Sequence, residues 1–203
     1  FDGIVLNAGA HYNVSLYARR SADFDQPLIV ALESMNGEVY ASAEIGGLSA
    51  EWQKFETILS PSQSDSLARL VVTTGGNDTV ALDMVSLFPQ ETFKNRKNGL
   101  RKDLAQAIAD LQPSFLRFPG GCIVHGHGLD NAYRWKDTVG DVAERKPNFN
   151  TWGYHQSYGL GFYEYFVFSE DIGAKALPII PVGVSCPHRG TQIERLTEMD
   201  PWI

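Results

Sequence analysis

The hydrophobic pattern of this chain changes its period near Pro89, and that change limits the possible folds more than any other feature. Before it, apolar and polar residues alternate with the period of two that a half-buried β-strand requires. After it, apolar residues recur at the spacing of helices. The sequence therefore predicts two domains, a β-rich one over residues 1–89 and a mixed one over residues 90–203.

The first domain is predicted to be an antiparallel β-sandwich of the jelly-roll kind. The alternating runs HYNVSLYAR, PLIVALE and EVYASAEI are separated by turn-forming residues such as Asn36-Gly37. Further strands are expected at Gln53–Leu59, Ala68–Thr73 and Val80–Phe88. The residues expected to face the core are Tyr12, Val14, Leu16, Ala18, Leu28, Val30, Leu32, Val39, Ala41, Ala43 and Ile45.

The hydrophobic pattern of the second domain predicts the order helix, strand, helix and strand, which is the repeating unit of an α/β fold. Helices are predicted over Asn98–Leu111 and Gly161–Ile172, each followed by an apolar strand, SFLRF and LPIIPVGV. The inward residues expected on these helices are Leu100, Leu104, Ile108 and Leu111, then Phe162, Tyr165, Phe166 and Ile172. Two strands cannot close a barrel. Asp200-Pro201 is a favourable helix start, yet the sequence ends two residues later, at Ile203. We therefore expect the sequence to be cut from a longer protein.

The turn after the first of these strands carries the clearest binding chemistry. Ligands of parallel α/β folds meet the loops at the C-terminal ends of strands, where FLRFPGGCIVHG lies. Arg117 can hold a carboxylate with two hydrogen bonds there, and Gly120 and Gly121 let the backbone approach a ligand closely. A surface ion pair for the arginine, and a plain turn for the glycines, are the alternatives.

The connection from this turn to the next helix is about 40 residues long, far beyond the usual length, which is typical of a functional loop. Its aromatic side chains have flat faces of the kind that stack on sugar rings. They are Tyr133, Trp135, Trp152, Tyr154 and Tyr158. The alternative is that they form a miniature core of the loop itself.

Three motifs resemble those of glycoside hydrolase family 51, the α-L-arabinofuranosidases. They are RFPGGC at Arg117–Cys122, YRW at Tyr133–Trp135 and WGY at Trp152–Tyr154. The similarity covers essentially the whole second half, and the first half resembles a carbohydrate-binding-module-like sandwich inserted in one branch of the family. The resemblance implies that residues 90–203 are an incomplete part of a (β/α)8 barrel. It also implies retaining hydrolysis of terminal α-L-arabinofuranosyl groups from arabinoxylan or arabinan, without a metal or organic cofactor.

The resemblance further implies roles for single residues. Arg117 matches the arginine that orients the nucleophilic glutamate, and Cys122 matches the position that lines the arabinose subsite. Trp135 matches a loop aromatic near that subsite. Gly121 and His125 are expected on the same rim, with His125 either contacting sugar hydroxyls or anchoring the loop.

The two catalytic carboxyl groups are not expected in this chain. Retaining hydrolysis needs a pair of carboxyl groups about 5–5.5 Å apart. The family places both on later barrel strands, with the acid/base in an Asn-Glu pair, and no Asn-Glu dipeptide occurs here. Glu164 and Glu170 fall within a helix pattern and are interpreted as solvated. We therefore expect this chain alone to be inactive.

Histidines and cysteines near the rim raise the question of a metal site. They are Cys122, His125, His127, His155, Cys186 and His188. Because the spacing C-x2-H-x-H fits no standard zinc pattern, no metal site is predicted. The two cysteines follow strand ends and could approach each other, but they are too few for a disulfide scaffold, and free thiols are favoured.

The charge and hydropathy of the chain limit its partners. A net charge of −7 argues against nucleic acid and anionic membranes, and no apolar run approaches the ~20 residues of a membrane span. The expected partner is an arabinose-containing oligo- or polysaccharide, with a homo-oligomer as an open alternative. The chain opens on Phe1 without a signal peptide, so the compartment is unknown, with an extracellular or cell-envelope parent protein slightly favoured.

Two further functions stay open on the sequence. One is a non-catalytic carbohydrate-binding protein, in which the sandwich binds glycan through Trp52, Tyr17 and Tyr40, although Trp52 could equally be edge packing. The other is a different barrel glycosidase of the same general mechanism, a β-xylosidase or an endoglucanase.

Overall fold

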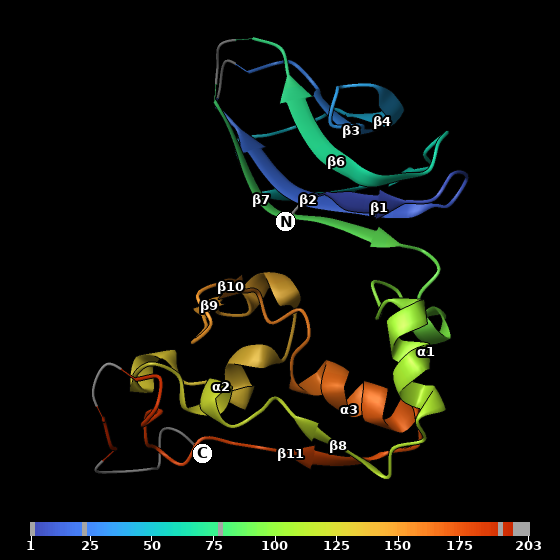
Figure 1. Ribbon diagram of the computed structural model, residues 1–203. Coiled ribbons are helices and arrows are strands. Elements are labelled where there is room, and N and C mark those ends of the chain that lie inside the picture. Colours follow the sequence, from blue (N-terminus) through green and yellow to red (C-terminus); the bar gives the residue numbers. More distant parts are fainter. Residues whose placement is uncertain (1–2, 22–23, 77–78, 191–192, 197–203) are drawn as a thin grey trace. The chain divides into compact units, whose positions relative to one another are not determined.

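The structure is a computed structural model that describes residues 3–21, 24–76, 79–190 and 193–196. The chain divides into two compact units, Phe1–Gln106 and Ala107–Ile203, and Figure 1 traces it through both. The predicted domain boundary at residue 89 stays a prediction. Residues 90–106 group with the first unit, and the helix α1 (Lys102–Asp110) crosses the division.

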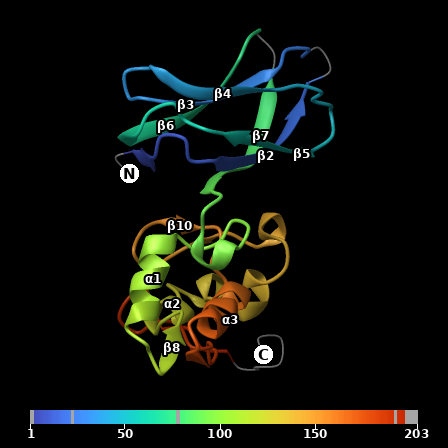
Figure 2. The same ribbon diagram turned by 90° about the vertical axis from the view of Figure 1, so that its right-hand side faces the viewer.

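The first unit is a β-sandwich, as the period of two predicts. Its strands are β1 (Ile4–Leu6), β2 (Tyr12–Arg20), β3 (Leu28–Glu33), β4 (Val39–Ile45), β5 (Gln53–Leu59), β6 (Asp65–Thr74) and β7 (Val80–Pro89). One sheet has the order β1-β6-β3-β4 and the other β5-β2-β7. All neighbouring strands are antiparallel, and Figure 2 shows the two sheets as two layers.

The core between the two sheets is built mostly from the predicted inward residues. Those that are buried are Tyr12, Val14, Leu16, Ala18, Leu28, Val30, Leu32 and Ile45. Ala41 and Ala43 are partly buried against them. The prediction for Val39 is wrong, because the register between β3 and β4 shifts after Leu32, so that Tyr40 packs against the core and Val39 is exposed.

The second unit contains the expected parallel pair, β8 (Phe115–Phe118) and β11 (Lys175–Pro178). The helix α3 (Phe162–Asp171) connects back to this pair and packs on it. The Phe118 ring stacks on Tyr165, with ring centroids 4.7 Å apart. Gly173 has φ +70° just beyond the helix, as a left-handed C-terminal cap requires. This strand, helix and strand arrangement confirms the incomplete α/β segment.

Several predicted boundaries and faces in the second half are wrong. The helix predicted from Asn98 begins at Lys102, because the preceding residues form a turn closed by the bridge between Thr92 and Arg101. Its apolar stripe is exposed, with Leu111 79% exposed. Among the described residues, β8 and β11 form hydrogen bonds only with each other. No further strand of this sheet therefore packs against the apolar residues of the adjoining helices. The exposed residues predicted to be inside are Leu104, Ile108, Leu111 and Phe166, and Leu177, Ile180 and Val182 of the predicted apolar strand are exposed as well.

The strand predicted over LPIIPVGV also differs from the structure, since β11 begins earlier, at Lys175, and ends at Pro178. The helix start predicted at Asp200-Pro201 lies outside the described residues. In the part of the chain that the structure describes, no helix is both long enough and apolar enough to cross a membrane.

Candidate functional site

The predicted rim segment leaves the C-terminal end of β8 and turns sharply. Arg117 lies opposite Leu177 of β11, and its side chain is exposed. A Cβ on Gly121 would stand 4.0 Å from an Arg117 guanidinium nitrogen, so the guanidinium lies beside the turn. Gly120 has φ +147°, which other residues rarely adopt. The backbone therefore requires glycine at position 120, whereas Gly121 has φ −86°, and the arginine lies at the strand end as predicted.

A short helix, α2 (Cys122–His125), follows this turn and ties it to the loop after β11. The His125 Nδ1 lies 2.6 Å from the Val184 carbonyl oxygen, and the His127 Nδ1 lies 2.9 Å from the Arg189 carbonyl oxygen. Since a carbonyl only accepts, each Nδ1 carries the proton and donates. Both histidines thus anchor two loops together, which was one of the two roles considered for His125.

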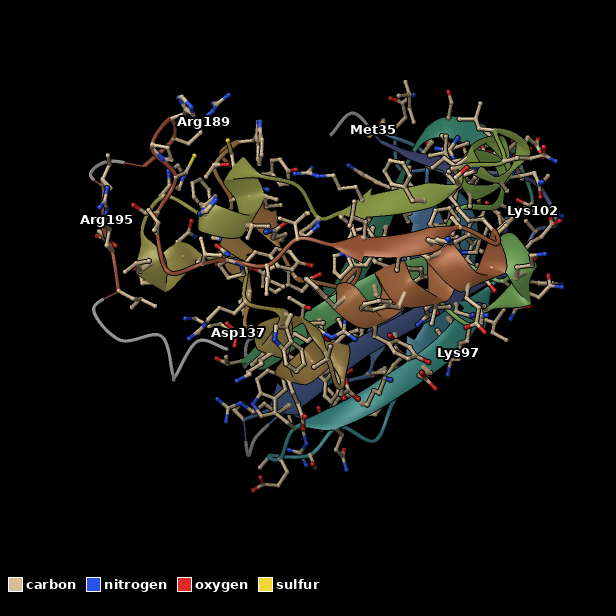
Figure 3. The ribbon with its side chains drawn as sticks, turned by 90° about the horizontal axis from the view of Figure 1, so that it is seen from below. Met35, Lys97, Lys102, Asp137, Arg189 and Arg195 are labelled. Carbon is tan, nitrogen blue, oxygen red and sulfur yellow. The ribbon has the colours of Figure 1, made fainter. Side chains whose placement is uncertain are left out.

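Glu194 strengthens the same junction. Its carboxylate accepts a hydrogen bond from the Leu129 N–H at 2.7 Å, and its backbone N–H donates to the Ser185 hydroxyl at 2.8 Å. The Ser185 N–H donates to the Glu194 carbonyl at 3.0 Å. The loop after β11, on which Arg189 is labelled in Figure 3, is therefore held against α2 by both backbone and side chains.

Both cysteines belong to the segments that form this junction, and both are free thiols. The Cys122 thiol acts as hydrogen-bond donor toward Cys186, which raises the pKa of Cys122, and burial adds to the effect. Burial also raises the pKa of Cys186, but hydrogen bonds from the His188 and Arg189 backbones and from Cys122 outweigh it, so its pKa lies below the usual value. The free thiols favoured by the sequence are confirmed.

The aromatic residues of the long loop divide into two groups. Tyr133 and Tyr158 are buried and meet edge to face with centroids 4.7 Å apart, in a core that they share with Phe118 of β8 and Phe162 of α3. Burial raises the pKa of both. Trp152 and Tyr154 are more than half exposed, and Trp135, on the 3-10 helix η3 (Trp135–Thr138), is partly so. Only this second group presents flat faces to a ligand.

The buried Arg145 and the partly buried Glu164 form an ion pair that the sequence did not reveal. The Arg145 guanidinium donates to both Glu164 carboxylate oxygens at 2.8 and 2.9 Å, and to the carbonyls of Tyr158 and Gly140. Glu164 also accepts from the Gly161 N–H at the start of α3. Glu164 was interpreted as a solvated helix residue, and this is wrong because it links the long loop to α3. Glu170 is exposed, as expected.

Burial raises the pKa of the Glu164 carboxyl, but the hydrogen bonds from Arg145 and Gly161 outweigh it. The pKa of Glu164 therefore lies below its usual value. A carboxylate that stays ionised and fully bonded is suited to holding a loop in place and poorly suited to donating a proton. We assign Glu164 a structural role.

The site residues predicted from the sequence are only partly brought together. Arg117, Gly121 and Cys122 lie along one turn, and His125 lies on α2 next to it. Trp135 lies on η3, where the Lys136 ammonium is 5.9 Å from its ring centre. In the described part of the chain no cluster of three or more potential metal ligands occurs. The functional roles of these five residues stay predictions.

The glycan platform considered on the sandwich is not formed by its three candidates. Tyr17 lies on β2, and Trp52 lies next to β5. The Trp52 side chain is exposed, and the Arg19 guanidinium lies over one face of its ring, 5.0 Å from the ring centre. Tyr40 lies on β4 in the other sheet, where it packs against the core and donates to Asp65 at 3.0 Å. Tyr40 therefore cannot share a stacking surface with the other two.

Comparison with known proteins identifies relatives for both halves. Residues 107–203 match the family described as "Alpha-L-arabinofuranosidase 1 domain". The chain is 45% identical over 194 residues to an extracellular exo-α-L-arabinofuranosidase of Streptomyces chartreusis, covering 90% of this chain and 23% of that protein. It is 41% identical over 188 residues to α-L-arabinofuranosidase 1 of Arabidopsis thaliana, covering 90% of this chain and 27% of that protein.

A solved structure agrees with these sequence matches. The structure of an arabinose-bound GH51 α-L-arabinofuranosidase superimposes with a TM-score of 0.89 at 34% sequence identity, over 98% of this chain and 33% of that one. The chain thus spans about a quarter of the length of the two curated relatives. The shared region includes both the sandwich and the α/β segment.

Proposed function

Since this chain belongs to glycoside hydrolase family 51, we propose that it forms part of a retaining α-L-arabinofuranosidase. The enzyme removes terminal α-L-arabinofuranosyl groups from arabinoxylan, arabinan and related oligosaccharides. The name of the Streptomyces relative supports an extracellular location for the protein. No metal or organic cofactor takes part in the proposed reaction.

The observation that carries this proposal is the position of the RFPGGC segment. It leaves the C-terminal end of a parallel strand, inside the region that matches the arabinofuranosidase family. Loops at that end of the strands bind substrate in barrel enzymes. The exposed Arg117 and the paired glycines beside it provide a charged group and a close backbone approach in one turn.

Arg117 acts on the nucleophile rather than on the sugar. Retaining hydrolysis uses one carboxyl group as acid/base and a second one, about 5–5.5 Å away, as nucleophile. A guanidinium binds a carboxylate through two parallel hydrogen bonds, so it fixes the direction of attack and keeps the carboxylate ionised. In the proposed enzyme both carboxylates come from outside these 203 residues, and this chain supplies the group that orients one of them.

The test is Arg117→Ala in the full-length enzyme, assayed with p-nitrophenyl α-L-arabinofuranoside. We expect kcat to fall by roughly 10²–10³-fold with little change in KM, because a preorganised charge is lost from the transition state. Arg117→Lys keeps the charge but loses the paired hydrogen bonds, and should recover only part of the rate. Arg69→Ala, on the sandwich, is the matched control and should leave kcat unchanged. An unchanged kcat for Arg117→Ala would contradict the assigned role.

The same assay separates the proposed activity from its alternatives. The 203-residue chain alone should give no turnover, because it is expected to lack both catalytic carboxylates. The full-length enzyme should prefer the arabinofuranoside over p-nitrophenyl β-D-xylopyranoside and cellobioside. A preference for either of those substrates would indicate a β-xylosidase or an endoglucanase, and binding of arabinan without turnover would indicate a carbohydrate-binding protein.

A further inference from the structure

A polar pocket of about 200 Å³ lies within the second unit, in the long loop between β8 and α3. Its walls come from the 3-10 helix η2 (Leu129–Asn131), from η3 and from the strand β9 (Asn148–Phe149). Asp137, which is labelled in Figure 3, lies on η3 and lines the pocket. No residue of the RFPGGC segment lines it. The function proposed above therefore assigns no role to its lining residues.

Tyr158 gives this pocket a buried hydrogen-bond donor. The residue lines the pocket although it is only 4% exposed. Its hydroxyl oxygen accepts a hydrogen bond from the Asn148 side-chain amide, and no residue among those that the structure describes accepts the hydroxyl proton. Burial raises the pKa of Tyr158, so the phenol stays protonated and can donate this proton to a ligand.

Charged side chains supply further binding groups at the same pocket. Asp130 and Lys146 line it, and neither forms a side-chain hydrogen bond or an ion pair with another described residue. The Asp137 carboxylate accepts a hydrogen bond from the Arg134 guanidinium at 2.8 Å, which holds it in place. The pocket thus combines acceptors, from the two carboxylates, with donors, from Lys146 and Tyr158.

Amide hydrogen bonds fix the walls of the pocket. The Asn148 side-chain amide donates to the Asn131 backbone carbonyl at 2.9 Å, and the Asn131 side-chain amide donates to the Phe149 carbonyl at 2.7 Å. The Asn131 side-chain oxygen accepts from the His127 N–H at 3.0 Å. A ligand therefore meets a largely preformed site, and little conformational freedom is lost when it binds.

The charges around the pocket disfavour two classes of ligand. The lining contains two carboxylates and one ammonium group, so it does not favour an anion such as phosphate. A calcium ion takes about six to eight oxygen ligands, and the described part of the chain has no cluster of three or more potential metal ligands. A neutral ligand with several hydroxyl groups fits, because each hydroxyl both donates and accepts hydrogen bonds.

The size of the pocket and the ring of Phe149 narrow this ligand to a sugar. Phe149 lines the pocket and is 45% exposed, so its ring offers an apolar surface to the C–H groups of a sugar. Pockets for drug-sized ligands have volumes of roughly 300–1,000 Å³. A pocket of about 200 Å³ therefore suits a single sugar ring.

We propose that this pocket binds one neutral sugar residue without a covalent step. Asp130 and Asp137 accept hydrogen bonds from the sugar hydroxyl groups. Tyr158 and Lys146 donate hydrogen bonds to them. This inference goes beyond the proposed hydrolase activity and does not depend on it. If that activity holds, the pocket gives the enzyme a second contact with a polysaccharide substrate.

The test is a titration of the isotopically labelled 203-residue protein, followed through its backbone amide signals in NMR spectra. The neutral probes are methyl α-L-arabinofuranoside and methyl β-D-xylopyranoside, and the charged comparisons are glucuronate and inorganic phosphate. We expect saturable shifts at residues 129–132 and 146–149 with at least one glycoside, and weaker binding of both anions. No saturable shift there with either glycoside, or equally tight binding of an anion, would overturn the proposal. Shifts confined to residues 117–122 would also overturn it, while they would support the site proposed at Arg117.

Two matched pairs of variants assign the binding to this pocket. Tyr158→Phe removes only the hydroxyl and should raise the Kd of the glycoside roughly 2–10-fold. Its control, Tyr165→Phe, removes a hydroxyl from the same core but outside the pocket, and should leave the Kd unchanged. Asp130→Ala changes an exposed position, so it should weaken binding without disturbing the fold, and Glu144→Ala, an exposed carboxylate outside the pocket, is its control. A Kd that neither Tyr158→Phe nor Asp130→Ala raises would refute the proposal.

Discussion

At the scale of single residues, the interactions that shape the site connect positions far apart in the sequence. Arg145 and Glu164 are 19 residues apart and face each other across the long loop. His125 and Val184 are 59 residues apart. Sequence spacing predicted that Arg117 would lie at a strand end, because a strand fixes its neighbours locally. It could not predict the Arg145–Glu164 pair, because irregular loop backbone decides which side chains meet.

Removing the Arg145 guanidinium should destabilise the second unit strongly. Its side chain is 3% exposed and its hydrogen bonds satisfy two carbonyls and a carboxylate. Arg145→Ala removes the charged partner of the partly buried Glu164, which keeps only its hydrogen bond from the Gly161 N–H, so we expect a loss of about 3 kcal/mol in the free energy of unfolding. Urea denaturation measures this loss. Arg101→Ala removes an exposed pair with Asp103 and is the control, which should change the free energy little. Equal effects of both changes would contradict a structural role for Arg145.

The lowered pKa of Glu164 predicts a pH dependence of stability. Because the folded pKa lies below the unfolded value of about 4.5, the ionised group stabilises the fold above pH 4.5. That stabilisation is lost as the pH falls through the folded pKa. In Glu164→Gln the difference from wild type should be largest near neutral pH and should shrink below pH 4.5. A difference that is constant from pH 3 to pH 7 would show that the charge of Glu164 is not involved.

At the scale of elements, the sequence predicts buried residues correctly where other elements of this chain pack against the element on all apolar sides. Strands β2 and β3 lie between neighbours in a finished sandwich, so their alternating residues are buried as predicted. The helix α1 has an equally clear apolar stripe, yet Leu104 and Leu111 are exposed. The period predicts the apolar stripe correctly, but a periodic pattern does not indicate whether the same chain contains a surface that packs against the stripe.

This difference in burial predicts that similar substitutions reduce the free energy of unfolding by very different amounts. Leu104→Ala on α1 removes an exposed side chain and should change the free energy of unfolding of this chain by less than about 0.5 kcal/mol. Leu16→Ala on β2 empties a fully buried position and should cost about 2–5 kcal/mol. Denaturant titration of the 203-residue chain tests both. In the full-length protein Leu104→Ala should become costly if later segments cover the stripe, and a large cost already in this chain would contradict its exposure.

At the scale of the whole molecule, each unit has a hydrophobic core of its own. The change of period at Pro89 is the reason to expect two domains, because a sheet and a helical layer cannot bury their apolar faces in the same pattern, and the boundary at residue 89 stays a prediction. The core of the sandwich was largely predictable from alternation. The smaller core around Phe118, Tyr133, Tyr158 and Phe162 was not, because half of it comes from irregular loop residues.

Two separate cores predict that the units unfold in separable transitions. Differential scanning calorimetry of the chain should resolve two components, because cooperativity extends only as far as continuous packing. Leu16→Ala should lower the melting temperature of one component by about 8 °C or more, since 1 kcal/mol corresponds to roughly 4–8 °C for a unit of this size. Arg145→Ala should lower only the other component. If both substitutions shift one common transition, the two units depend on each other for stability, and the division into independent domains is wrong.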